Sequence, residues 1–270
     1  MLLDKVPVCE PFPWGHLLAY LRVRATPQAE SVETDRYVRR IGRRSVQVSY
    51  QRRERCLLVE TQGRVSRHDV LQRVGALFDV AHDAQPVAQQ LQASAVLAPR
   101  LRAVPGMRPL GAWSPFELCV RTILGQQVSV AAACTLMRRL VERCGEIEPE
   151  RLVAADLANF GMPGKRVAAL QAFARACVEG SVRFTAQWPQ LDARLRELPG
   201  FGPWTRGYLA IRLGRQTDAF PETDLGLIRA AGVASSTALL ALARQWQPYR
   251  AYAATYLWAI DAEQSVAAPP

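Results

Sequence analysis

The stretch LPGFGPWTRGYLAIRLGRQTDAFPETDLGLIR, residues 198–229, decides the fold of this chain. Two glycines, Gly200 and Gly202, interrupt two helical patterns, which predicts one helix that ends near Glu197 and another that starts at Pro203. Together they form a helix–hairpin–helix, whose glycines permit a tight turn and a close approach of the backbone to a phosphate. A purely structural turn between packed helices is the alternative reading.

The rest of the chain divides into a short β segment and a long helical one. RSVQVSYQ (44–51) and RCLLVETQ (55–62) have strand-like patterns with β-branched residues, and they predict a small antiparallel sheet. WGHLLAYLRVRAT (14–26) suits either a strand or a short helix. From His68 onward apolar residues recur at helical spacing almost to the end of the chain. The sequence therefore predicts an α+β fold that is mostly α.

Composition narrows the partners without naming one. The 270 residues are 49% hydrophobic and carry a net charge of +10 with a pI of about 9.8, which suits a polyanionic partner but does not require one. Lys5 and Lys165 are the only lysines. The six cysteines show no C-x-x-C spacing, so we expect reduced thiols rather than a zinc or iron–sulfur site. The N-terminal stretch has no signal-peptide pattern and no segment has eighteen uninterrupted apolar residues, so we expect an intracellular, cytoplasmic protein.

Two further helix starts are clear. Ser114 and Glu117 flank Pro115 as a capping box with proline at the first helical position. Ser129 caps the next helix, which ends at Gly145.

Polar residues at the breaks between these helices have two readings each. Gln126 and Gln127 are either solvated turn residues or side chains that face a ligand. Lys165 and Arg166 open a helix where cations oppose the helix dipole, an arrangement that a phosphate partner would offset. Without such a partner they are ordinary solvated side chains.

Asp224 follows a proline-rich turn about twenty residues after the hairpin. Its position favours a helix N-cap. Aromatic residues give it a second reading, because Trp204 and Tyr208 share a helix face and Tyr256 and Trp258 come late in the chain. These rings belong either to the core or to the wall of a cleft that holds a flipped base by its π-face.

At this point the chain resembles the helix–hairpin–helix DNA glycosylases, and within them the bacterial DNA-3-methyladenine glycosylase II (AlkA type) family. The resemblance runs nearly end to end and is carried by PFPWGHLLAYLRVRA, VRTILGQQVSVAAA, GMPGKRVAAL, LPGFGPWTRGYLAIR, DAFPETDLGLIR and WQPYRAYAATYLW.

The resemblance implies a role for each matching residue. Asp224 takes the position of the catalytic aspartate, and the base-pocket aromatics fall on Tyr20, Trp204, Tyr208 and Trp258. The DNA wedge falls on Gln126 and Gln127, and phosphate contacts fall on Gly200, Gly202, Thr205, Lys165 and Arg166. The expected cofactor set is empty apart from a structural monovalent cation, held when DNA is bound by the carbonyls of Arg196, Leu198 and Phe201.

The family also implies a domain plan. We expect an N-terminal sheet domain over residues 1–85, a connector over 86–110 that packs with the C-terminal helices, a helical subdomain with the hairpin over 111–215 and a C-terminal helical subdomain over 216–270 that carries Asp224. The active site is expected in the cleft between the helical subdomains. The expected partner is damaged double-stranded DNA, bound by a monomer of the bacterial nucleoid with no membrane association and no obligate protein partner.

The implied activity is monofunctional hydrolysis that releases alkylated purines. Bifunctional relatives place a lysine where this chain has Trp204. A glycosylase-lyase for oxidised bases and a non-catalytic DNA-binding protein stay as alternatives. Lesion preference is open, because Gln127 stands where the alkylation enzymes have a leucine wedge and Ala259 stands where they have a second aromatic residue.

Overall fold

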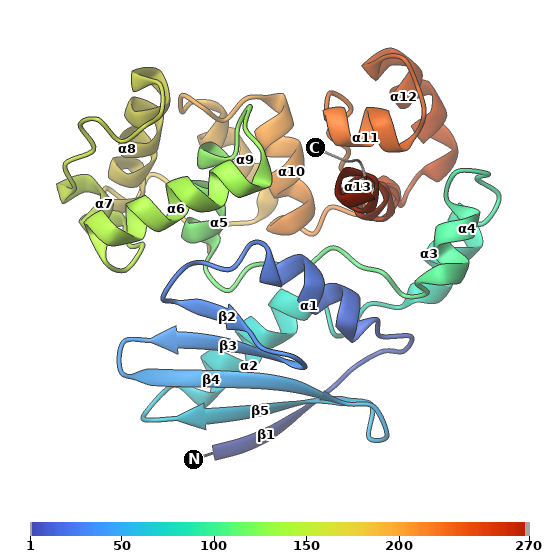
Figure 1. Ribbon diagram of the computed structural model, residues 1–270, viewed down its shortest axis with the longest axis horizontal. Helices are drawn as coiled ribbons and strands as arrows, with labels where there is room; N and C mark the ends of the chain where they lie inside the picture. Colours follow the sequence, from blue (N-terminus) through green and yellow to red (C-terminus); the bar gives the residue numbers. More distant parts are fainter. Residues whose placement is uncertain (1, 268–270) are drawn as a thin grey trace.

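The computed structural model describes residues 2–267, with side chains described for residues 3–259. An antiparallel sheet and its covering helices form one end of the molecule, and two groups of helices form the other (Figure 1). The predicted α+β, mostly helical class is confirmed. Among the described residues, no helix combines the length and apolarity needed to cross a membrane.

The sheet has five strands in the order β1-β5-β4-β3-β2, all antiparallel. The two predicted strands are β4 (Arg44–Gln51) and β5 (Cys56–Gln62). Three more join them: β1 (Leu2–Pro7), β2 (Glu30–Val32) and β3 (Arg36–Ile41). Alternate residues of β4 and β5, such as Val46, Val48 and Val59, are buried against the helices that cover one face.

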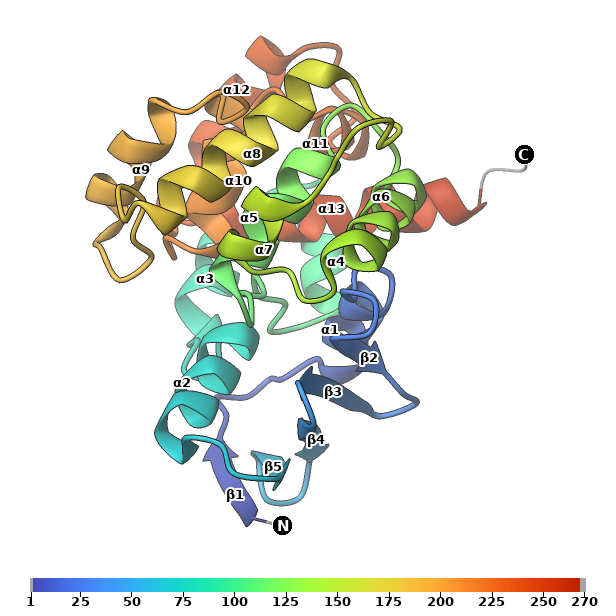
Figure 2. The ribbon, with the colours of Figure 1, turned by 90° about the vertical axis from the view of Figure 1, so that its left-hand side faces the viewer.

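The ambiguous segment at residues 14–26 begins with helix α1 (Trp14–Arg22). Leu17, Leu18 and Leu21 are buried at helical spacing, so one apolar stripe packs onto the sheet. Helix α2 (Arg67–Phe78) covers the same core and is capped by Ser66. Figure 2 shows both helices between the sheet and the helical end of the molecule.

The segment expected as a connector contains two short helices, α3 (Ala84–Leu91) and α4 (Ala98–Ala103). It contacts the end of the chain directly. The Trp246 indole donates to Ser94 Oγ at 3.0 Å, and the Tyr256 hydroxyl donates to the Val104 carbonyl at 3.2 Å. In Figure 1 these helices lie beside the C-terminal group.

Six helices follow in one group: α5 (Pro115–Leu124), α6 (Val130–Cys144), α7 (Pro149–Ala154), α8 (Gly164–Val178), α9 (Trp188–Arg196) and α10 (Pro203–Arg212). The last group is α11 (Leu225–Ala230), α12 (Ser236–Ala243), the 3-10 turn η1 (Arg244–Trp246) and α13 (Arg250–Ala267). The predicted caps at Ser114 and Ser129 and the helix end at Gly145 are confirmed.

Two separate hydrophobic cores organise these groups. One joins the sheet, α1 to α3 and the helices from α11 to α13, and the other joins α5 to α10. Tyr20 and Trp258 pack against the first core, whereas Tyr208 packs against the second. The predicted site residues therefore lie along the boundary between the two cores.

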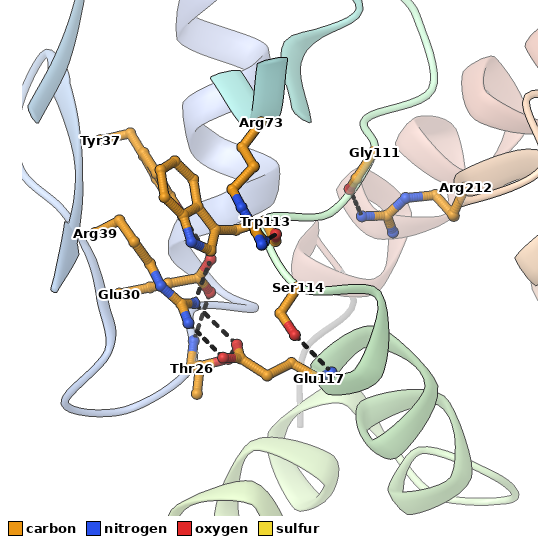
Figure 3. A network of polar contacts seen from close by, with 10 residues as sticks. All are labelled: Thr26, Glu30, Tyr37, Arg39, Arg73, Gly111, Trp113, Ser114, Glu117 and Arg212. Atoms are coloured by element: carbon orange, nitrogen blue, oxygen red, sulfur yellow. Dashed lines mark hydrogen bonds and ion pairs between the residues drawn. The ribbon is translucent and has the colours of Figure 1, made fainter. Parts of the chain in front are cut away.

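A buried ion pair ties the sheet to α5 (Figure 3). Arg39 on β3 donates to both carboxylate oxygens of Glu117, which also accepts from Thr26 Oγ1 at 3.1 Å. The predicted capping box is consequently only half formed. Ser114 accepts from the Glu117 amide, but the Glu117 side chain turns to Arg39 instead of the helix terminus.

Three of the six cysteines, Cys56, Cys119 and Cys144, are buried, and burial raises the pKa of each thiol. All six are free thiols, and Cys9 is exposed. Buried thiols with raised pKa values are unreactive, so these three act as small apolar side chains.

Candidate active site

Asp224 lies at the N-terminus of α11, where one carboxylate combines two roles. Its Oδ1 accepts from the Leu227 amide at 2.9 Å, which is the expected N-cap bond, and from the Trp258 indole at 3.2 Å. Its Oδ2 accepts from the Trp204 indole at 2.8 Å. The three donors fix the carboxylate in one orientation at the boundary between the cores.

The four predicted pocket aromatics come together beside this carboxylate from three helices. Trp204 and Tyr208, four residues apart on α10, stack with ring centroids 5.8 Å apart and planes at 8°. Trp258 of α13 meets Tyr208 edge to face at 5.5 Å. Tyr20 of α1 places its hydroxyl 3.1 Å from that of Tyr208. All four side chains are half-buried, so the cluster is neither core nor open surface.

Tyr256 does not join this cluster. Its ring is 2% exposed and its hydroxyl donates to the Val104 carbonyl, so it belongs to the core beneath the connector. Two residues separate Tyr256 from Trp258 on α13, and such neighbours point to different faces of a helix.

Arg212 is a site residue that the sequence pattern did not identify. It lies one helical turn after Tyr208, and it is buried with 7% of its surface exposed. Its guanidinium donates to both the Tyr20 and the Tyr208 hydroxyl, and its other nitrogens donate to the carbonyls of Leu110 and Gly111. A lone arginine within the apolar run YLAIRL is the sequence signal that could have pointed to it.

The hairpin joins α9 to α10 as predicted, but its two glycines differ. Gly200 has φ +85°, which favours glycine, and a Cβ there would come within 3.0 Å of Ala169 Cβ. Gly202 is the extended N-cap of α10, with φ −65°, and a Cβ there would meet nothing within 4 Å. Only Gly200 is required for the turn. The bare backbone at Gly202 leaves room for a ligand to approach.

Gln126 and Thr205 brace the hairpin from behind. The Gln126 amide donates to the Gly200 carbonyl at 2.7 Å and to Thr205 Oγ1 at 2.9 Å, and the Thr205 hydroxyl donates to the same carbonyl at 3.2 Å. Thr205 is 3% exposed. The structure therefore contradicts a wedge side chain at Gln126 and a phosphate contact by the Thr205 hydroxyl. Both groups hold the turn in shape.

Gln127 is the exposed member of the predicted wedge pair. It has φ +58° at the break between α5 and α6, a left-handed conformation uncommon for glutamine. Val128 and Val130 beside it are also exposed, at 38% and 46%. The break thus presents a short, partly apolar surface with an amide at its tip.

The two lysines lie in different parts of the molecule. Lys165 is exposed in the first turn of α8, and Ala169, one turn later, is the residue that a Cβ on Gly200 would meet. Lys165 and the neighbouring Arg166 therefore flank the hairpin. Lys5 lies on β1 and pairs with Glu54 at 2.6 Å. Neither lysine is among the residues that surround Asp224.

The hairpin carbonyls suit a monovalent cation in part. The Leu198 carbonyl accepts a long bond of 3.4 Å from the Phe201 amide. Within residues 2–267, the carbonyls of Arg196 and Phe201 accept no such backbone bond, so oxygen ligands are available at the turn. Among the described side chains, no group of three or more His, Cys, Asp or Glu residues is arranged to hold a metal ion.

The largest cavity lies elsewhere. It has a volume of about 1250 Å³ and opens between the sheet and α5, lined by residues that include Arg39, Trp113 and Glu117. None of the predicted site residues lines it.

Comparisons with known proteins agree with this arrangement. Residues 5–114 match the family model for the AlkA N-terminal domain, and residues 120–237 match that for the HhH-GPD superfamily base excision DNA repair protein. DNA-3-methyladenine glycosylase 2 of Escherichia coli is 31% identical over 92% of this chain and 94% of its own length.

Solved structures share the fold. The 3-methyladenine DNA glycosylase from Archaeoglobus fulgidus superposes with a TM-score of 0.82 at 20% identity, over 97% of this chain and 99% of its own. The Schizosaccharomyces pombe 3-methyladenine DNA glycosylase Mag1, solved with abasic DNA, superposes with a TM-score of 0.56 at 22% identity, over 64% of this chain and 95% of its own.

Proposed function

Because the chain belongs to the AlkA-type family of helix–hairpin–helix DNA glycosylases, we propose that it removes alkylated purines from duplex DNA by hydrolysing the N-glycosidic bond. The observation that carries the proposal is the Asp224 carboxylate, held by the indoles of Trp204 and Trp258. An N-cap alone would need only the Leu227 amide. The additional indole donors orient the carboxylate within an aromatic site.

The chemistry needs one carboxylate. Alkylation at N3 or N7 makes a purine cationic, so it leaves readily and the sugar passes through an oxocarbenium-like state. The Asp224 carboxylate stabilises that positive charge and accepts a proton from the water that attacks C1′. The indole donors hold the carboxylate in position before the reaction, so little reorganisation is needed as charge develops.

The aromatic cluster binds the base. A cationic ring stacked on tryptophan gains about 1–2 kcal/mol from the π-face, and the attraction tolerates different shapes. Trp204 and Trp258 supply such faces next to Asp224. A broad range of alkylated purines with modest discrimination among them follows.

Water rather than an amine attacks the sugar. Trp204 occupies the place in α10 where a Schiff-base lysine would lie, Lys5 is paired with Glu54 on the sheet, and Lys165 lies on α8. The enzyme therefore stops at the abasic site and does not cut the strand.

DNA is held through its backbone. The amides at the start of α10, with Lys165 and Arg166, contact phosphates on one side of the lesion, and Gln127 fills the space left by the flipped nucleotide. A monovalent cation on the hairpin carbonyls would add positive charge toward a phosphate. The enzyme acts on the nucleoid as a monomer, without another cofactor or an obligate protein partner.

The test is a panel of duplexes that carry 7-methylguanine, hypoxanthine or an etheno adduct, incubated with the protein in the presence and absence of borohydride. We expect free alkylated base by chromatography, intact strands before alkali and no covalent adduct. A stoichiometric trapped adduct would contradict hydrolysis by water, and failure to release any base would leave a DNA-binding protein without catalysis.

A further inference from the structure

Arg212 and the two pocket tyrosines form a buried triangle at the end of the aromatic wall. One guanidinium nitrogen donates to the hydroxyls of Tyr20 and Tyr208, whose oxygens lie 3.1 Å apart. The guanidinium carbon lies 5.1 Å from the Tyr20 ring centroid and 5.5 Å from that of Tyr208. Figure 3 shows the hydrogen bond from Arg212 to the Gly111 carbonyl, which helps to anchor its side chain.

The hydrogen bonds of this triangle leave one donor over. Each tyrosine carries one hydroxyl proton, and Arg212 has no acceptor. One proton is used in the bond between the two hydroxyls. Within residues 3–259, the other proton has no acceptor, since both hydroxyls bond otherwise only to Arg212 as their donor. Repelled by the guanidinium, this O–H points away from Arg212.

The surroundings strengthen that donor. Burial by itself would raise the pKa of Tyr20, but Arg212 and Arg24 outweigh it and hold the pKa below the usual value. The Arg24 guanidinium lies 4.0 Å from the Tyr20 ring centroid. Burial raises the pKa of Tyr208 to about 12, against the pull of Arg212. A phenol with stabilised negative charge on its oxygen is a stronger hydrogen-bond donor, so Tyr20 is the better donor of the two.

We propose that the Tyr20–Tyr208 pair, polarised by Arg212, donates a hydrogen bond to an acceptor atom on the far edge of the flipped base, and so extends the substrates to neutral purines such as deaminated ones. The proposal rests on the proposed glycosylase function. Its geometry comes from the aromatic wall. Tyr208 stacks on Trp204 and meets Trp258, and both indoles contact Asp224, so the wall runs from the carboxylate to the hydroxyls.

The donor matters for neutral bases because of where the electrons go. When the C1′–N9 bond breaks, its electron pair passes to the base, and a neutral purine becomes an anion whose charge spreads to its carbonyl oxygen. Water forms the new C1′–O bond, its proton passes to Asp224 and then to the departing base. A hydroxyl aimed at the carbonyl stabilises the anion as it forms. A cationic base leaves as a neutral molecule and gains little from the same donor.

The test compares one neutral and one cationic substrate with single-atom variants. Tyr20→Phe and Tyr208→Phe keep the rings and remove the hydroxyls. Tyr249→Phe is the matched control, because Tyr249 packs edge-on against Tyr252 and not against the Asp224 cluster. The substrates are a hypoxanthine duplex and methylated genomic DNA from which released 3-methyladenine is measured. Melting temperatures check that each variant folds.

We expect Tyr20→Phe to lower kcat/KM for hypoxanthine release about ten- to a hundredfold, while 3-methyladenine release changes by less than about threefold. Tyr208→Phe should act in the same direction, and Tyr249→Phe should alter neither rate. Equal losses on both substrates, or unchanged hypoxanthine release, would overturn the proposal. Loss of 3-methyladenine release by the unmodified protein would instead overturn the glycosylase function itself, so the two failures are distinguishable.

Discussion

Asp224 shows how one side chain can satisfy two roles that its sequence position sets against each other. An N-cap and a catalytic carboxylate look like alternatives in the sequence. A carboxylate has about four acceptor sites, so the Leu227 amide and the two indoles bind it together. Capping fixes the carboxylate relative to α11, and the indoles fix it relative to α10 and α13.

The Trp258 indole donor can be removed while an aromatic ring is kept. Trp258→Phe deletes the hydrogen bond of 3.2 Å to Asp224 Oδ1 and leaves the bond from Trp204. A hydrogen bond to a charged group contributes about 1.5–3 kcal/mol, so we expect base release to slow at least about tenfold. Single-turnover release from a 7-methylguanine duplex measures this effect. An unchanged rate with an unchanged melting temperature would show that the indole does not position the carboxylate.

His82 makes the stability of the protein depend on pH. The ring is 7% exposed, stacks on Tyr252 at 4.6 Å, and has no hydrogen-bond partner for Nε2 within residues 3–259. Burial, reinforced by Arg108 and Arg215 and opposed by Asp83, lowers its pKa from 6.5 to about 4. Between these values the unfolded chain binds a proton that the folded protein does not. Stability is therefore lost as the pH falls through this window.

His82→Phe keeps the stacked ring and removes the titration. We expect the free energy of unfolding of the parent, relative to this variant, to fall by about 2–3 kcal/mol between pH 7 and pH 4.5. Urea unfolding at the two pH values measures the difference. A difference that is the same at both values would mean that His82 titrates normally in the folded protein.

The hairpin assigns different work to its two glycines. Gly200 makes the turn, whereas Gly202 leaves the N-terminus of α10 open. Gly202→Val should weaken binding to damaged and undamaged duplex equally, about tenfold, because a phosphate contact carries no sequence information.

Gly200→Ala is the comparison for that variant. It places a Cβ in a left-handed conformation against Ala169 and should lower stability by about 1–3 kcal/mol. DNA titrations and thermal melts on both variants separate the two effects. A Gly202→Val protein that melts early but binds DNA normally per folded molecule would reduce this glycine to a structural role.

Local signals in the sequence predicted the elements that depend on neighbouring residues. The hairpin, the caps at Ser114 and Ser129 and the two strands of strongest alternation follow from spacing within a few positions. Strand β3 was missed because its three arginines hide the alternation, and one of them, Arg39, is buried only through its pairing with Glu117.

Contacts between distant segments were not predictable in the same way. The bond from Gln126 to the Gly200 carbonyl spans 74 positions, and that between the Tyr20 and Tyr208 hydroxyls spans 188. No local pattern encodes such a pairing. The family resemblance supplied the identities of the pocket aromatics, but only the fold showed Arg212 behind them.

At the scale of the whole molecule, the net charge of +10 raises the concentration of any polyanion near the surface, but individual contacts depend on where each cation lies. The two lysines provide a matched pair. Lys165→Gln should reduce the slope of log affinity against log salt by about 0.9, the value for one lost phosphate contact. Lys5→Gln should leave the slope unchanged, since Lys5 lies on the sheet with Glu54. Equal slopes for all three proteins would exclude Lys165 from the interface.

The division into two cores places the reactive carboxylate and its aromatic wall at their shared boundary. Tyr20 and Trp258 are held by one core and Tyr208 by the other. The arrangement brings a charge-stabilising group and a base-binding surface together only when both halves of the molecule are folded. The central claim is therefore that the charge of Asp224, at this boundary, drives base release.

Asp224→Asn tests that claim most directly, because asparagine caps a helix as well as aspartate does and the variant changes charge with little effect on α11. Single-turnover release of 7-methylguanine should fall by a factor of about 10² to 10³, equivalent to about 3–4 kcal/mol of transition-state stabilisation. Affinity for the duplex and the melting temperature should stay close to those of the parent. Base release at a near-parental rate would contradict the account and leave Asp224 as a helix cap alone.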